Sequence, residues 1–115
     1  MSQQLMVKTT SRSSRSRKKK LEKDLQSEVL SKLNMYGGKW YGIKKTNEDG
    51  CPDIIGWYNG YNFAIELKVG KNKTSFAQDI AIEKIKSSGG ERTIATVCRT
   101  FDEIFSIVKE TERSK

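Results

Sequence analysis

Three charged side chains occur at a spacing that can support phosphodiester chemistry. Asp53 follows a proline, and Glu66 is followed two residues later by Lys68, in the series P-D…E-x-K. Two carboxylates can hold a hard cation such as Mg²⁺, while an ammonium group can orient water and stabilise charge building on a phosphate. The sequence contains no histidine, which excludes His-based triads, histidine general bases and the usual zinc hydrolase sites.

A β-hairpin is expected to bring these residues together. Residues 53–58 and 61–69 are rich in aromatic and β-branched residues, and the Asn59-Gly60 pair between them is a strong signal for a two-residue turn. Counting outward from such a turn places Asp53 opposite Glu66, with Lys68 on the same face. Because like charges opposed across a sheet repel, we expect a divalent metal to compensate them, with the Leu67 carbonyl as a further ligand.

The elements around the hairpin indicate an α/β fold, an α+β mixed sheet flanked by helices in the order α-β-β-β-α-β-α. Capping boxes are predicted where Ser75 precedes Gln78 and where Thr100 precedes Glu103, and glycine pairs end the first two helices. The predicted segments are a helix over 21–36, a strand over 40–43, a polar loop over 46–50, a helix over 75–88, a strand over 92–98 and a final helix from 100 to about 108.

The basic charge is concentrated at the N-terminus. The chain has 115 residues, enough for one small domain, and its formal net charge is +8. Seven of the 22 basic residues fall in residues 1–20, which contain no acid, leaving 15 bases against 14 acids. We expect a disordered tail over 1–20 that grips DNA phosphates or is merely solvated, and a single domain over 21–115. The tail residues proposed to bind DNA are Arg15, Arg17, Lys18, Lys19 and Lys20.

No apolar stretch can span a bilayer, so an intracellular protein is expected.

Four segments in order carry a family resemblance. They read Gly50-Cys-Pro-Asp-Ile-Ile, Phe63-Ala-Ile-Glu-Leu-Lys, Ser75-Phe-Ala-Gln and residues 85–90. This series resembles the PD-(D/E)XK nuclease superfamily, in particular small VRR-NUC and Holliday-junction-resolvase-like endonucleases, over residues 21 to about 107. The resemblance implies a restriction-endonuclease-like core, Mg²⁺ (or Mn²⁺) dependence, cleavage of branched or structured DNA, and a possible homodimer.

The resemblance also assigns roles residue by residue. Asp53 and Glu66 would hold the metal, and Lys68 would be the catalytic lysine. Gln78 matches the glutamine that follows the motif in such nucleases, although it also suits the cap of its helix. The first helix usually contributes a glutamate; Glu22 is the choice, with Glu28 on a different face as the competing candidate. Either Lys44 or Lys45 is expected to contact DNA phosphates.

Other interpretations stay open from the sequence alone. Trp57 would share the Asp53 face, with Tyr58 and Tyr61 on the opposite one, and packing against helices is favoured over stacking on bases. Cys51 is interpreted as a loop residue, because no histidine is present to activate it. Competing functions are a non-catalytic nucleic-acid-binding protein that acts through its tail, a structural or assembly protein, and a sequence-specific restriction endonuclease.

Overall fold

The computed structural model of the chain describes residues 21–44, 50–70 and 73–113. The N-terminal tail, Lys45 and most of the polar loop predicted over 46–50 lie outside the described residues. Within the described part, a four-stranded mixed sheet is combined with three helices in a small α+β domain. No helix among these residues is both long and apolar enough to cross a membrane.

The elements follow the predicted order. A helix over residues 21–36 comes first, and the strands β1 (Lys39–Gly42), β2 (Ile54–Tyr58) and β3 (Tyr61–Leu67) follow it. The chain then forms α2 (Phe76–Gly89), β4 (Thr93–Cys98) and α3 (Phe101–Arg113). The sheet order is β1-β2-β3-β4, with β4 parallel to β3 and the other neighbours antiparallel. The last helix is longer than predicted, because the buried face that begins with Ile104 and Val108 continues to Thr111.

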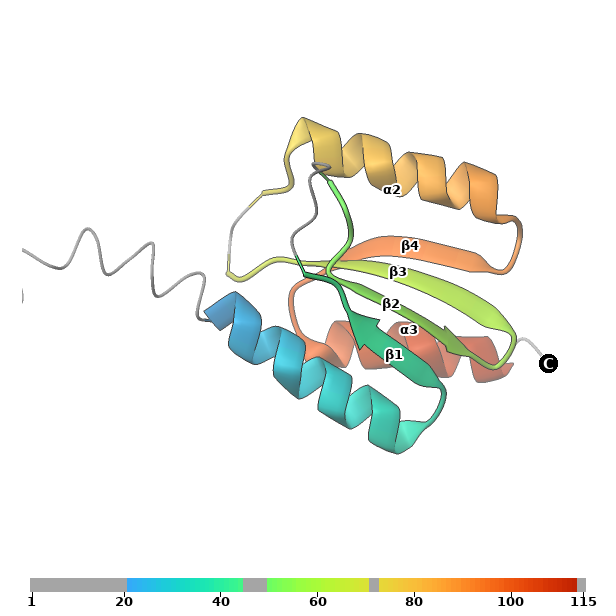
Figure 1. Ribbon diagram of the computed structural model, residues 1–115. Helices are drawn as coiled ribbons and strands as arrows, with labels where there is room; N and C mark the ends of the chain where they lie inside the picture. Colours follow the sequence, from blue (N-terminus) through green and yellow to red (C-terminus); the bar gives the residue numbers. More distant parts are fainter. Residues whose placement is uncertain (1–20, 45–49, 71–72, 114–115) are drawn as a thin grey trace, which may run out of the picture.

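Helices cover the two faces of the sheet unequally (Figure 1). On one face, the N-terminal helix and α3 enclose the larger core, in which Val29, Ile54, Ile65 and Ile104 are fully or almost fully buried. On the other face, α2 packs over β3 and β4 through a smaller cluster built around Ile82. The β1–β2 half of that second face lies beyond this cluster, and no helix among the described residues packs closely against it.

The β2–β3 hairpin has the predicted turn. Asn59 and Gly60 have positive φ angles of 55° and 83°, as the two central residues of a type I′ turn require. Tyr58 therefore pairs with Tyr61, and the register continues outward to Ile54 opposite Ile65. This register puts odd-numbered residues of β2 and even-numbered residues of β3 on the α2 face of the sheet.

Two glycines are needed where other groups approach the backbone closely. A Cβ atom on Gly56 would lie 2.1 Å from the buried Trp40 ring, which packs across β2 at that point. Gly50 has a φ of +89°, and a Cβ there would lie 2.5 Å from the Ala77 carbonyl oxygen. The glycine of the Gly50-Cys51-Pro52-Asp53 segment thus lets the chain pass against the first turn of α2 on its way to β2.

Candidate active site

Asp53 lies where the hairpin opens. The strand β2 begins at Ile54, one residue later than predicted, but the Asp53 N–H still donates to the Ile65 carbonyl at 3.0 Å. The paired residues of the ladder end at Ile54 and Ile65, and a regular continuation beyond them would place Asp53 opposite Glu66, on the face that carries α2. The two carboxylates are close enough to share a proton, and this contact helps to raise the pKa of Glu66.

The position of Asp53 is fixed by hydrogen bonds from three directions. Its backbone carbonyl accepts from the Ile43 N–H at 2.8 Å and from Nε2 of Gln26, also at 2.8 Å. Its side-chain Oδ2 accepts from the Leu67 N–H at 2.8 Å, where a backbone carbonyl would have continued the ladder. One carboxylate oxygen, Oδ1, is thereby left for another partner.

Glu66 is an almost fully buried carboxylate whose hydrogen-bonding capacity is only partly used. Only 3% of the surface of Glu66 is exposed to solvent. Oε1 accepts from Nε2 of Gln78 at 3.2 Å, whereas Oε2 is buried without a hydrogen-bond donor among the described residues. Burial, followed by the neighbouring Asp53 carboxylate, raises the pKa of Glu66 to about 8, against an opposing effect of Lys68.

Lys68 extends from the end of the same strand. Its backbone N–H donates to the Cys98 carbonyl at 3.0 Å, which anchors the residue to the end of β4. Its half-buried side chain shares the Glu66 face, two residues on, and its positive charge lowers the pKa of Glu66. Within the described part of the chain the ammonium forms no hydrogen bond or salt bridge, so it is available to a ligand.

Gln78 forms the predicted cap of its helix and also contacts Glu66. Its Oε1 accepts from the Ser75 N–H at 2.9 Å while Oγ of Ser75 accepts from the Gln78 N–H at 3.1 Å, which completes the capping box of α2. Its Nε2 donates to Glu66. One amide group therefore starts the helix with its oxygen and holds the buried carboxylate with its nitrogen.

The two glutamates of the N-terminal helix are in different environments. Glu22 is half-buried and close enough to Glu66 that its charge helps to raise the Glu66 pKa. Glu28 is exposed and forms a 2.9 Å salt bridge with Lys32 one turn along the same helix. The structure brings Glu22, and not Glu28, toward the Asp53–Glu66 pair.

The other residues predicted to belong to the site have no described side-chain contact with the Asp53–Glu66 pair. Lys44 is exposed just beyond the end of β1. The Leu67 side chain is buried in the larger core, so that only its peptide group can serve the site. Lys45 and the tail residues Arg15, Arg17, Lys18, Lys19 and Lys20 lie outside the described residues.

The donor set suits a hard divalent cation. Oδ1 of Asp53 and the unpaired Oε2 of Glu66 are carboxylate oxygens at one end of the sheet. The described residues contain no cluster of three or more His, Cys, Asp and Glu side chains arranged for a metal. A site here would therefore rest on two carboxylates, a backbone carbonyl and water, a composition that matches the preference of Mg²⁺ for several retained waters.

Gln26 is a site residue that sequence reasoning missed. It lies one helical turn after Glu22, and its amide ties the N-terminal helix to the backbone of Asp53. In sequence it is one polar residue on a helix with many, and its role depends on Asp53 being 27 residues away in the chain but adjacent in space. No local pattern carries that information.

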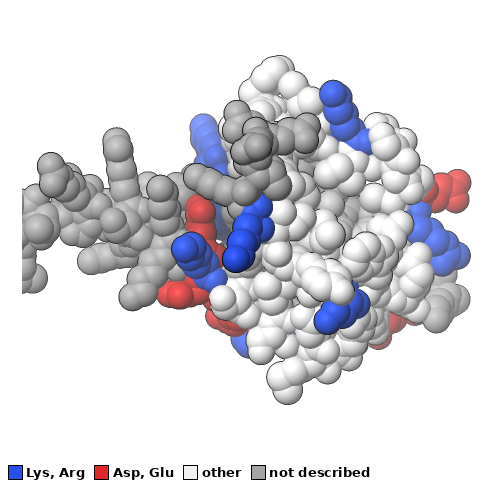
Figure 2. All heavy atoms as spheres, in the orientation of Figure 1, with Lys and Arg blue, Asp and Glu red and all other residues white. Residues whose placement is uncertain are grey.

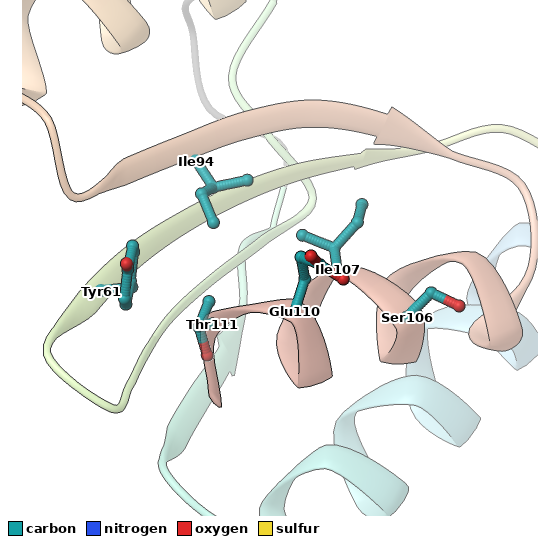
Figure 3. Close-up of a pocket in the computed structure, with 6 residues that line it drawn as sticks. All are labelled: Tyr61, Ile94, Ser106, Ile107, Glu110 and Thr111. Carbon is teal, nitrogen blue, oxygen red and sulfur yellow. The ribbon is translucent and has the colours of Figure 1, made fainter. Parts of the chain in front are cut away.

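A hollow lies on the face of the sheet opposite the paired carboxylates (Figure 3). It has a volume of about 370 Å³ and lies between α3 and the start of the strands β3 and β4. Its lining is mostly apolar and its one carboxylate, Glu110, is within 3.7 Å of Arg113. Tyr61 and Ile94 line it from the face opposite Glu66, so this hollow is separate from the paired carboxylates.

Searches of protein families and of curated protein sequences find no match to this chain. The geometry of the residues at the open end of the hairpin is therefore the basis for assigning a function.

Proposed function

We propose that the protein is a metal-dependent endonuclease that hydrolyses phosphodiester bonds in DNA. The observation that carries the proposal is the buried Glu66 carboxylate, which faces Asp53 and has an oxygen without a donor. A buried carboxylate beside a second one destabilises a fold unless a cation compensates them. A cation bound at this point would relieve that cost and would lie next to the ammonium of Lys68.

The same residues suggest how the work would be divided. Asp53, Glu66 and the Leu67 carbonyl would hold Mg²⁺ or Mn²⁺, which when bound supplies Lewis-acid stabilisation of the phosphate and a more acidic water. Lys68 would orient the attacking water and stabilise negative charge on the phosphate. Gln78 would hold Glu66 in its orientation, Gln26 would hold Asp53, and Glu22 would add negative charge at the edge of the site.

The fold and the motif support a finer assignment within this proposal. The α-β-β-β-α-β-α order, with P-D just before one strand and E-x-K at the end of its partner, is compatible with the restriction-endonuclease-like core that the resemblance to PD-(D/E)XK nucleases implies. We propose a substrate of branched or structured DNA, as in VRR-NUC and Holliday-junction-resolvase-like enzymes, and a homodimer that makes paired cuts. The basic tail and Lys44 or Lys45 would contact phosphates without reading sequence.

The test is a cleavage assay on linear duplex, flap, four-way-junction and single-stranded DNA, each with Mg²⁺ and with chelator. We expect Mg²⁺-dependent cleavage that is lost in Asp53→Asn, Glu66→Gln and Lys68→Met. Glu28→Gln is the matched control, because Glu28 is an exposed carboxylate in an ordinary helical salt bridge. Cleavage that survives the three site substitutions, or that needs no divalent metal, would contradict the proposal. Salt-sensitive binding without any cleavage would favour the non-catalytic alternative.

A further inference from the structure

The uncovered half of the site-bearing sheet face carries two exposed aromatic rings. Trp57 on β2 is 47% exposed and Tyr41 on β1 is 49% exposed. Their ring centroids are 6.2 Å apart and their planes are inclined by 77°, so one ring meets the edge of the other. The expectation that aromatics of the hairpin pack against helices is confirmed for Tyr58 and Tyr61, which pack on the larger core, but Trp57 belongs to neither core cluster.

These rings share a face with the candidate active site. Lys39 pairs with Trp57 and Tyr41 pairs with Ile55, which places all four side chains on the side of the sheet that bears Asp53 and Glu66. Trp57 is four residues along the strand from Asp53, or roughly 13 Å at about 3.3 Å per residue. That distance is about the rise of four stacked nucleotides at 3.4 Å each.

The charges of this region suit a nucleic acid. The Lys39 ammonium lies over the Tyr41 ring, 5.1 Å from its centroid. The paired positions of this face around Trp57 carry no acidic side chain; they are Lys39, Tyr41, Ile55 and Asn62. Figure 2 shows a largely uncharged central surface with both Lys and Arg and Asp and Glu side chains around its edges. An aromatic surface for bases next to cations for phosphates is the combination that proteins use to bind single strands.

We propose that Trp57, supported by Tyr41 and flanked by Lys39, stacks on unpaired bases of a DNA strand that runs from the candidate active site across β2 and β1. The position of this strand relative to the cut rests on the proposed function. Stacking requires bases that are not enclosed in a duplex, so the proposal narrows the substrate to DNA with a single-stranded or unpaired segment beside the scissile phosphate.

The experiment measures binding in chelator, where the candidate chemistry is switched off. A short oligothymidylate and a blunt duplex are titrated into the full chain, and affinity and tryptophan emission are followed. Trp40 is only 2% exposed, so an emission change on binding the single strand reports mainly on Trp57. Trp57→Leu removes the aromatic face, Trp57→Phe retains one, and Phe76→Leu is the control because Phe76 is an exposed aromatic residue (79%) on α2 and not on the strands that carry the aromatic pair.

We expect Trp57→Leu to bind the oligothymidylate about tenfold more weakly, the size of effect expected for losing a base stack, while duplex affinity is unchanged. Trp57→Phe should retain most of the affinity and Phe76→Leu all of it. Unchanged single-strand affinity in Trp57→Leu, or an equal loss for the duplex, would overturn the proposal. So would a wild-type dimer in light scattering that Trp57→Leu converts to a monomer, because a second copy would then occupy the face. If the single strand binds as expected but no substrate is cleaved with Mg²⁺, the proposed nuclease function fails while the stacking surface stands.

Discussion

A glutamate lies at each end of the β2–β3 hairpin, and the two carboxylates are in opposite environments. At the turn end, Glu112 of α3 accepts hydrogen bonds from the hydroxyl groups of Tyr36 and Tyr58 at 2.5 and 2.8 Å. At the open end, Glu66 is buried opposite another carboxylate with one oxygen unsatisfied. Hydrogen bonds lower the pKa of Glu112, whereas burial raises that of Glu66 to about 8.

The carboxylate at the turn end stabilises the fold, whereas the carboxylates at the open end lower its stability. The tyrosine–glutamate contacts tie the C-terminal part of α3 to the N-terminal helix and to β2, and the Asn59 side chain adds a 3.0 Å bond to the Thr111 carbonyl. The open end instead concentrates negative charge where hydration is poor. A cluster that costs stability and is kept in a defined geometry is typical of a functional site.

The largest expected effect comes from exchanging the two carboxylates for amides. Glu66→Gln should reduce cleavage by at least about 10²–10³-fold, as for loss of a principal electrostatic group in an active site. Above a pH of about 8, where Glu66 is ionised in the folded protein, it should also raise the melting temperature of the metal-free protein, since it removes a buried charge with an unsatisfied oxygen. Glu112→Gln should do the reverse, lowering the melting temperature and leaving cleavage per folded molecule unchanged. Calorimetry and a cleavage assay on both variants decide whether the two ends differ as described.

The second-largest expected effect is on Mg²⁺ binding, and it should distinguish two polar residues near opposite ends of the N-terminal helix. Gln26→Leu removes the side-chain donor to the Asp53 carbonyl and should weaken Mg²⁺ binding by about 10–100-fold, the usual range for residues that position metal ligands. Asn34→Leu is the matched change, because Asn34 makes its hydrogen bonds to the backbones of Leu30 and Trp40, away from the carboxylates. It should lower stability without changing the Mg²⁺ concentration required for half-maximal cleavage. Equal Mg²⁺ requirements in the two variants would show that Gln26 is only structural.

A pH titration of stability without metal should sharpen the contrast. The pKa of Glu66 is raised from 4.5 to about 8, so the folded protein holds a proton that the unfolded chain has released. Its contribution to stability is complete below about 4.5 and is lost as the pH rises toward 8 and beyond, at no more than about 1.4 kcal/mol per pH unit for one group. The pKa of Glu112 is lowered, so its contribution is lost in acid instead. Denaturant unfolding in chelator from about pH 2 to about pH 9 measures both slopes, and Glu66→Gln should abolish only the slope between pH values of about 4.5 and 8.

The smallest effect separates the two roles of Gln78. Ser75→Ala removes one bond of the helix cap and should cost about 1 kcal/mol of stability, with cleavage per folded molecule retained. Gln78→Ala removes the cap partner and the donor to Glu66 together, so it should lower cleavage as well. Parallel unfolding curves and cleavage rates compare the variants. Equal cleavage rates in both would mean that the contact with Glu66 has no part in the reaction.

The amino-acid sequence by itself determined the local features of this protein. Asn59-Gly60 specifies a turn whose positive φ angles set the register of the hairpin as far as Ile54 and Ile65, next to the point where the carboxylates of Asp53 and Glu66 meet. Ser75 and Gln78 specify the start of α2 because a capping box involves residues only three apart. Such features could be predicted, since the interactions that create them lie within a few residues or follow from strand periodicity.

Only the tertiary structure decided which distant side chains meet the carboxylates. Glu22 and Glu28 are equivalent acids on one helix until the docking of that helix brings Glu22 toward Glu66 and leaves Glu28 in solvent. Gln26 acquires its role through the same docking, and Trp57 stays exposed because α2 packs over β3 and β4 and stops short of β2. These outcomes depend on how helices settle on the two faces of the sheet, which is governed by the packing of the whole core and not by any short pattern.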